Sequence, residues 1–203
     1  QQYVVDQDIL SANKYIAGLA RLIRLTLHNS SLAFITVADE VAYLSAYLAL
    51  EKLRFKEKME YAIDVDPQIL QNSCYIPPML IQPYVENSVR HGLRHRKGRM
   101  GHIWLRVSQG KEPQRPGLTV IVEDNGIGRE RSAQYKTAEH IEYQSKGMTM
   151  TADRIRIINA TYGADIRVEV IDLKDADNQA AGTRVVMQFN AFDHLHPNQK
   201  ATS

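Results

Sequence analysis

The spacing of apolar residues changes near Met59, and this change constrains the fold more than any other feature. Two stripes with helical spacing precede it: Ile9, Ile16, Leu19, Ile23 and Leu27, then Val41, Leu44, Leu48 and Leu50. The polar turn at residues 29–31 separates these stripes, and Thr36 with Asp39 gives a capping-box signature for the second helix. Residues 1–58 are therefore predicted to form an antiparallel helical hairpin.

Patterns of strands and helices alternate after Met59. Strands are predicted at residues 61–66, 103–107, 118–122, 166–170 and 184–189, and helices from Pro77 to Val89 and from Met148 to Tyr162. The charged residues 129–146 are predicted to form a mobile surface loop, and residues 193–203 a polar tail. This mixture predicts an α+β domain at residues 59–192, with one mixed sheet and helices on one face.

Bulk properties of the chain narrow the classes of function. The net charge of +2 is too small to indicate a nucleic-acid partner. A single cysteine, Cys74, cannot form an internal disulfide, so a reducing cytoplasmic setting is expected. Apolar runs fall short of the roughly 20 residues that span a bilayer. Because the first residue is Gln1, we expect a piece of a longer protein, whose membrane anchor would lie outside these residues.

Polar residues cluster in the segment from Pro83 to Gly92. In an α-helix Asn87, Arg90, His91 and Arg94 would share one face, since they follow steps of three and four. An amide oxygen can coordinate Mg²⁺, and guanidinium groups pair with phosphate oxygens. A helix whose solvent face is simply polar would give the same pattern.

Three further segments could contribute to a ligand site. Asp124 ends an apolar strand and precedes Gly126 and Gly128, so a carboxylate would lie beside a backbone that a ligand can approach closely. The segment 145–148 is predicted at a helix start, where free N–H groups bind anions. The pair Gly182-Thr183 opens the last strand. Each of these segments taken alone is also compatible with an ordinary turn or helix start.

The order and spacing of the four segments resemble the ATP-binding domain of the GHKL superfamily, which includes gyrase, heat-shock chaperones, histidine kinases and MutL. The similarity is greatest to the LytS-type sensor histidine kinases, because the block I-P-P-M-L-I-Q-P-Y-V-E-N-S-V-R-H-G at residues 76–92 is typical of that group. The hairpin adds to the resemblance, which extends over residues 9–190. It implies a Bergerat-type sandwich preceded by a partial dimerisation and phosphotransfer hairpin.

The resemblance also implies a role for each residue around the first segment. Asn87 would bind Mg²⁺, and Glu86 would lie beside it, near the metal-bound water or the phosphates, so these two are the catalytic candidates. Arg90 would face the phosphates of ATP, and His91 would face the nucleotide.

The remaining segments would complete the ATP site. Asp124 would accept a hydrogen bond from the adenine amino group, with Thr183 supporting it. Gly126 and Gly128 would shape the adenine pocket.

The segment that precedes the predicted helix at Met148 departs from the family pattern. Lys146 and Gly147 would lie at the phosphate end, with residues 129–146 as a lid over ATP. However, Ser145 replaces a glycine and Met150 replaces an asparagine of the usual G-I-G-L-x-N pattern. A side chain at the glycine position restricts the backbone, and a thioether cannot replace the amide contact.

The implied reaction is transfer of the ATP γ-phosphoryl group to a histidine upstream of this sequence, and then to a response regulator. The family motif P-H-F-x-F-N is absent here and His28 lacks its neighbours, so the chain alone is not expected to phosphorylate itself. A homodimer is expected for the full-length protein, and a membrane only through other regions. Two alternatives stay open: a GHKL ATPase like MutL or gyrase, and a nucleotide-binding or dimerising regulatory module without kinase activity.

Overall fold

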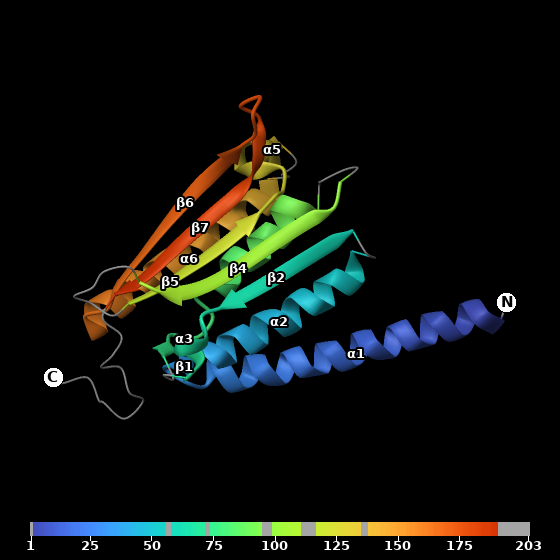
Figure 1. Ribbon diagram of the computed structural model, residues 1–203, viewed down its shortest axis with the longest axis horizontal. Coiled ribbons are helices and arrows are strands. Elements are labelled where there is room, and N and C mark those ends of the chain that lie inside the picture. The colour runs from blue at the N-terminus through green and yellow to red at the C-terminus, as the bar shows by residue number, and fades with distance from the viewer. Residues whose placement is uncertain are drawn as a thin grey trace.

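The computed structural model describes residues 2–55, 58–71, 74–94, 99–110, 117–134 and 138–190. Its first two helices, α1 (Gln2–Ser30) and α2 (Val37–Arg54), form the predicted hairpin. The capping box is confirmed, because the Asp39 N–H donates to Thr36 Oγ1 at 3.1 Å and the Thr36 N–H donates to Asp39 Oδ2. Figure 1 shows α1 projecting well beyond the rest of the molecule. Within the described part of the chain, every helix is too short or too polar to cross a lipid bilayer.

A five-stranded mixed sheet forms the centre of the domain. Its order is β2, β4, β5, β7, β6, with β2 parallel to β4 and every other pair antiparallel. The strands are β2 (Met59–Val65), β4 (Gly101–Gln109), β5 (Gly117–Asp124), β6 (Asp165–Lys174) and β7 (Ala180–Asn190). The sheet confirms the predicted α+β class and contains all five predicted strands, each lengthened or shifted by a few residues at its ends.

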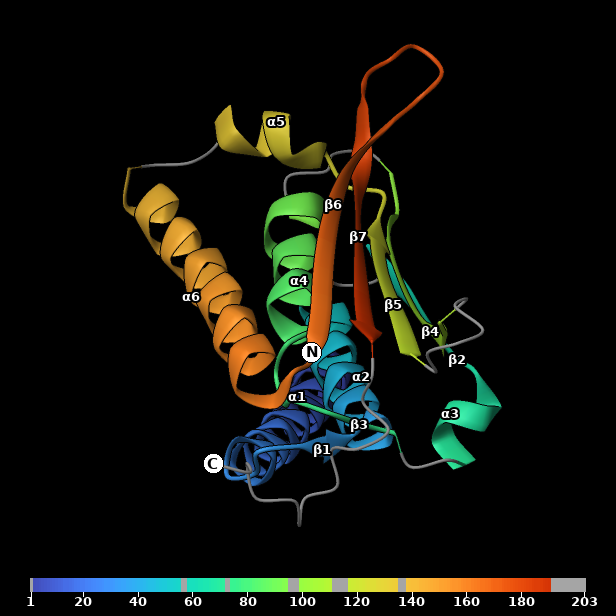
Figure 2. The same ribbon diagram turned by 90° about the vertical axis from the view of Figure 1, so that its left-hand side faces the viewer.

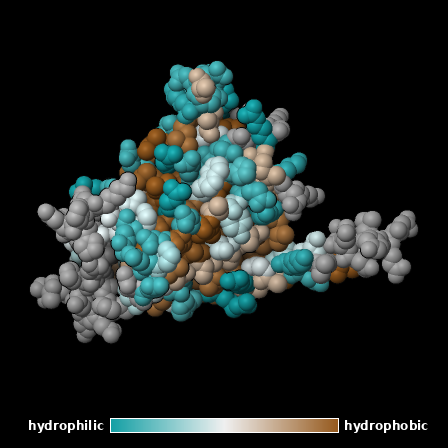
Figure 3. Space-filling model, in the orientation of Figure 1, coloured by the Kyte–Doolittle hydropathy of each residue, from teal (hydrophilic) through white to brown (hydrophobic). Residues whose placement is uncertain are grey.

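Helices cover one face of the sheet and leave the other face open (Figure 2). The covering elements are α4 (Gln82–Asn87), the π-helix η1 (Ser88–Leu93) and α6 (Ala138–Tyr162), while α5 (Gly128–Gln134) lies across one end. Alternation along β4 buries Ile103, Leu105 and Val107 against these helices and places Trp104 on the open face, stacked on His102. Hydrophobic and hydrophilic residues are mixed on that open face (Figure 3).

The hairpin shares its core with the domain. Tyr43, Leu44, Tyr47 and Leu48 of α2 are buried in the same cluster as the inner face of the sheet. Two short strands, β1 (Ile35–Thr36) and β3 (Tyr75–Ile76), pair beside the hairpin turn, and the short helix α3 (Pro67–Gln71) follows β2. The hairpin therefore packs directly on the elements that carry the functional site, and the division at residue 58 stays a prediction.

Two predicted boundaries are wrong. The helix predicted from Pro77 begins instead at Gln82, because β3 and a turn at Met79 with a positive φ of 57° precede it. The loop predicted at residues 129–146 is largely helical, since α5 and the first part of α6 occupy it and only residues 135–137 lie outside the described residues. Residues 193–203, the predicted tail, also lie outside the described residues.

Candidate functional site: a pocket at the end of the sheet

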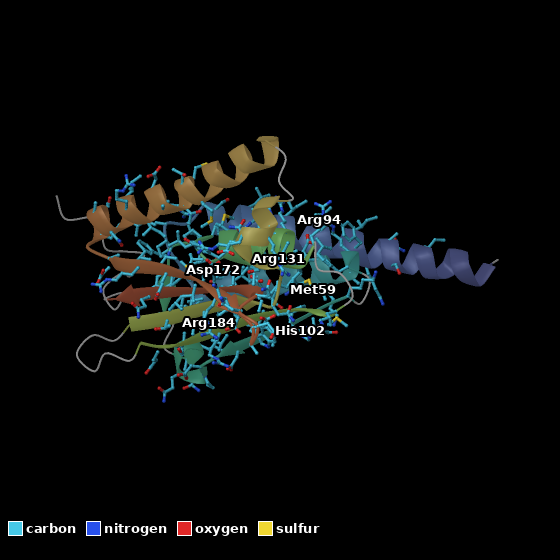
Figure 4. All side chains as sticks on the ribbon, turned by 90° about the horizontal axis from the view of Figure 1, so that it is seen from above. Met59, Arg94, His102, Arg131, Asp172 and Arg184 are labelled. Atoms are coloured by element: carbon cyan, nitrogen blue, oxygen red, sulfur yellow. The ribbon has the colours of Figure 1, made fainter. Side chains whose placement is uncertain are left out.

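A pocket of about 310 Å³ opens where β5 ends and β7 begins. Its walls come from α4, η1, β5, α5, α6, β6 and β7. The lining residues are Tyr84, Asn87, Ser88, His91, Gly92, Asp124, Gly128, Arg129, Ser132, Met148, Val170, Thr183 and Val185. This volume lies within the roughly 300–1,000 Å³ of small-molecule sites. In Figure 4, Met59, His102, Asp172 and Arg184 mark the end of the sheet at which the pocket lies.

Asp124 is the buried acid of this pocket. Its carboxyl is 2% exposed, accepts a hydrogen bond from Ser88 Oγ at 2.8 Å on Oδ2, and accepts the Gly126 N–H at 2.8 Å on Oδ1. Burial raises the pKa of Asp124, while the Ser88 hydroxyl and then the N–H groups of Gly126 and Thr183 act in the opposite direction. A carboxylate fixed in this way can accept a hydrogen bond from an amino group that enters the pocket.

The glycine of the following turn is needed for close packing. A Cβ on Gly126 would lie 2.3 Å from the Gly92 Cα of η1, a separation that atoms do not tolerate. The two backbones therefore touch, and the Ile127 N–H donates to the Gly92 carbonyl at 3.0 Å. Gly126 thus acts behind the pocket wall and fixes η1 against the end of β5, whereas Gly128 belongs to the wall itself.

The helical segment that carries Asn87 changes its winding immediately after that residue. The Arg94 N–H donates to the Val89 carbonyl, which is the five-residue step of a π-helix. Asn87 and His91 therefore line the pocket, while Arg90 and Arg94 are exposed outside its lining. The face predicted for an α-helix is thus divided, because that prediction assumed regular four-residue hydrogen bonds.

Asn87 contacts α6 in this structure. Its Nδ2 donates to the Met148 Sδ at 3.0 Å, so the amide oxygen keeps its capacity to bind a cation. Among the described residues there is no group of three acidic, histidine or cysteine side chains arranged to hold a metal ion. A Mg²⁺ at Asn87 would therefore complete its shell with water and ligand oxygens, as this ion commonly does.

Glu86 lies on the hairpin side of α4 and outside the pocket lining. Its Oε1 accepts a hydrogen bond from Gln82 Nε2 at 2.6 Å. Burial and then the nearby Glu86 carboxylate raise the pKa of Tyr43 on α2 to about 12. The structure therefore brings Glu86 and Arg90 toward the hairpin, since both also affect the pKa of Tyr47, which burial raises above its usual range.

The segment around Lys146 is placed differently from the prediction. Helix α6 begins at Ala138, so Lys146 and Gly147 lie inside the helix and the expected helix start at Met148 is wrong. The side chains of residues 133–147 lie outside the described ones. The prediction failed because Ser145 and Met150 are better helix formers than the glycine and asparagine of the family pattern.

Several pocket residues escaped the sequence analysis. Ser88 holds Asp124, and Met148 contacts Asn87, yet each stood beside a motif residue without its own signal. Arg129 forms a bidentate pair with Asp172 at 2.7 and 2.6 Å, which joins α5 to β6. The hydrogen bond to Arg129 lowers the pKa of Asp172. Sequence alone could not pair these two residues, because they meet only when α5 crosses the end of the sheet.

Comparisons with known proteins match this chain to sensor histidine kinases. The profile of the family described as histidine kinase matches residues 1–59. The sensor protein LytS of Staphylococcus epidermidis is 31% identical over 121 residues, covering 60% of this chain and 19% of LytS. The sensor histidine kinase YpdA of Escherichia coli is 30% identical over 118 residues, covering 58% of this chain and 20% of YpdA. The chain thus spans about a fifth of the length of these two relatives.

Sensor kinases are also found among the solved structures that match this chain, with TM-scores below 0.5. The mycobacterial histidine kinase MprB is 14% identical, with a TM-score of 0.48 that covers 77% of this chain and 97% of MprB. The histidine kinase ThkA, solved in complex with the response regulator TrrA, is 12% identical, with a TM-score of 0.45 that covers 93% of this chain and 50% of that structure. In sequence the chain is thus similar to the LytS-type sensor histidine kinases, both in these matches and in the motifs at residues 76–92 and 124–128.

Proposed function

We propose that this chain is the ATP-binding catalytic region of a two-component sensor histidine kinase. The observation that carries the proposal is the buried Asp124 at one end of a pocket that also contains Asn87 and His91. An acceptor for an amino group, apolar walls from Val170 and Val185, and an amide oxygen suit the base and the metal-bound phosphates of ATP. When bound, Mg²⁺ would offset the phosphate charge.

Each side chain of the pocket would then have a task. Asp124 would accept the adenine amino group, and Thr183, whose N–H acts on the Asp124 carboxyl, would support it. Asn87 would hold Mg²⁺ after its contact with Met148 opens. His91 would contact the nucleotide, while Lys146 and Gly147 would approach the phosphates from α6. Such a site acts by positioning and by charge stabilisation, the requirements of phosphoryl transfer.

The phosphoryl acceptor would be a histidine upstream of these residues, and a response regulator would receive the group next. A second copy of the chain would complete the hairpin as a four-helix bundle. The support is the apolar stripe of α1, because Ile9, Ile16 and Ile23 recur every seven residues and each remains more than half exposed. An exposed apolar stripe of this kind on a helix is typical of a subunit interface.

A regulatory module without kinase activity is the second candidate. The observation that favours it is the α6 helix, which runs through Ser145 and Gly147, where the family has a glycine-rich segment, and brings Met148 onto Asn87. In such a module the pocket would bind nucleotide weakly or not at all, and the hairpin would retain its role in association.

Calorimetric titration of Mg·ATP tests the proposal directly. We expect saturable binding that Asp124→Asn weakens by at least about tenfold, since an amide replaces the fixed acceptor. Glu123→Gln is the matched control, because Glu123 is the neighbouring acid and pairs with Arg184 on β7. Equal binding by all three proteins would contradict the adenine role of Asp124.

Activity separates the two candidates. Full-length protein incubated with γ-labelled ATP should acquire an acid-labile phosphohistidine, which the regulatory module would not form. Binding without labelling would leave the pocket assignment intact and favour the second candidate.

A further inference from the structure

A second buried acid, Glu40 of α2, lies where the hairpin meets helix α4, the helix that ends at Asn87 in the pocket. Its side chain is 0% exposed, and the tasks proposed for the pocket residues make no use of it. Burying a carboxyl group is costly unless its oxygens find partners. The position of Glu40 is therefore informative about what the hairpin does for the site.

The partner of Glu40 is the turn that begins α4. The Met79 N–H donates to Glu40 Oε2 at 3.1 Å, and the N–H groups of Ile81 and Gln82 lie near enough to lower the pKa of this carboxyl. Met79 has a φ of 57°, which is unusual for a residue with a side chain. The turn is therefore fixed in an uncommon conformation by an acid that is distant in sequence.

Helix α4 depends on this distant acid for its first turn. Within the described chain, none of the residues at the start of α4 caps it with a side-chain hydrogen bond, and Pro83 lacks an N–H. The free N–H groups at a helix start favour a negative charge. Glu40 supplies that charge from α2, so it replaces a local cap.

The carboxyl group of Glu40 gains or loses its proton near neutral pH. Burial raises its pKa to about 7, although the Met79 N–H, the Ile81 N–H and the Arg154 charge on α6 lower it. The other titratable groups nearby are Tyr43 on α2, whose pKa Glu40 raises, and Glu86 on α4. Among the described residues Glu40 Oε1 has no hydrogen-bond partner, an arrangement that costs less for a neutral carboxyl than for a charged one.

We propose that Glu40 is a positioning residue that ties the hairpin to the pocket by holding the turn at Met79, and so fixes Asn87 at the end of the same helix. For its effect on nucleotide, this inference rests on the proposed ATP site. The ionised carboxylate holds the turn more firmly than the protonated acid, since charge-assisted hydrogen bonds are the stronger ones. Movement of α2 would reach Asn87 through this contact.

Two measurements on the whole chain test the proposal. The first follows the backbone amide signals of Met79 and Asn87 by nuclear magnetic resonance between pH 5.5 and 8.5. Both signals should titrate together with a midpoint near the pKa of Glu40, about 7. Titration of Met79 without Asn87, or of neither, would overturn the proposal, and this readout needs neither a variant nor a nucleotide.

The second measurement compares Mg·ATP affinity at pH 6 and pH 8 in the original chain, Glu40→Gln and Glu51→Gln. Glu51 is the matched control, because it is also a buried acid of α2 but pairs with Arg54 instead of α4. The original chain and Glu51→Gln should bind several-fold more tightly at pH 8 than at pH 6. Glu40→Gln should lose this difference and bind about tenfold more weakly at pH 8.

An unchanged pH profile in Glu40→Gln would overturn the positioning role. If none of the three proteins binds nucleotide, the proposed ATP site has failed, and the joint titration of Met79 and Asn87 alone decides whether Glu40 positions the helix. A uniform loss of affinity at both pH values would indicate a purely structural residue and would also overturn the proposal.

Discussion

Two buried acids with different surroundings contact the segment formed by α4 and η1. Glu40 contacts the turn before α4, and Asp124 contacts Ser88 at the start of η1. Asp124 has a hydroxyl and backbone N–H groups on both oxygens, whereas Glu40 has a hydrogen bond on one oxygen only. Burial raises the pKa of each, but fuller hydrogen bonding favours the charged form of Asp124. The first acid is suited to a constant role as acceptor, and the second is suited to change its charge.

Replacing Ser88 by alanine tests how much the Ser88 hydroxyl stabilises the buried Asp124 carboxyl. The change leaves Asp124 Oδ2 without its 2.8 Å hydrogen bond in a buried site, so we expect unfolding to require about 1–3 kcal/mol less. Urea denaturation measures this loss, and ATP affinity should fall with it. Ser30→Ala at the exposed end of α1 is the control and should stay within about 0.5 kcal/mol.

Stability should depend on pH through Glu40. The unfolded chain releases this proton near pH 4.5, but the folded protein keeps it to about pH 7. The contribution of Glu40 to the free energy of unfolding is therefore fully present below pH 4.5. It falls by about 3 kcal/mol as the pH rises to about 7.

Denaturant unfolding at several pH values checks the sign. The difference in unfolding free energy between the original chain and Glu40→Gln should move against the original chain from pH 4.5 to 7, and then level off. A difference that stays constant over this range would show that the folded protein does not retain the proton.

At the scale of elements, the pocket helix explains what sequence could and could not predict. Apolar spacing and the capping box located α1, α2 and the strands, because those signals are local. The π-helix after Asn87 was not predictable from local spacing, since it packs through Gly92 against Gly126, which follows a distant strand. In this winding Asn87 and His91 line the pocket together with Asp124, whereas Arg90 does not.

Gly126→Ala should disturb that contact. The new Cβ would meet backbone atoms of Gly92, which cannot rotate away as a flexible side chain would. We expect a loss of about 1–3 kcal/mol in unfolding free energy, together with weaker ATP binding, as η1 shifts from β5. Gly18→Ala is a useful comparison, because its Cβ would meet only the flexible end of Leu50 and alanine favours helix α1. Equal effects of both changes would contradict the argument.

Helix α6 competes with the proposed metal site through Met148. Met148→Leu conserves volume but removes the sulfur that accepts the Asn87 amide, so opening this contact should become easier. We expect ATP affinity to rise about threefold, measured by calorimetry at constant Mg²⁺. The exposed Met150→Leu on the same helix is the control and should leave the affinity unchanged. A lower affinity in Met148→Leu would mean that the thioether assists binding.

For the whole molecule, the shared core determines how a signal could travel. Helix α2 buries one side in the core that also contains residues of α4, and it contacts α1 on the other side, so we expect a shift of the hairpin to reach α4. Glu40 supplies a polar link in this contact, because it accepts a hydrogen bond from the Met79 N–H that precedes α4. Association of α1 with another chain would thus be joined through α2 to the geometry at Asn87.

The apolar stripe of α1 gives the last prediction. Ile16 and Ile23 are 63% and 51% exposed and lie two turns apart on one face of α1. They therefore belong to a continuous apolar stripe and are not single scattered surface residues, as a monomer commonly has. Ile16→Asn with Ile23→Asn should convert a dimer into a monomer in light scattering after size-exclusion chromatography. Arg21→Asn with Lys14→Asn, on the polar face of the same helix, should remain dimeric. The pocket should still bind Mg·ATP in the monomer, because none of its lining residues belongs to α1 in the described structure. If the original chain is already a monomer, the proposal that α1 forms a dimer interface is wrong.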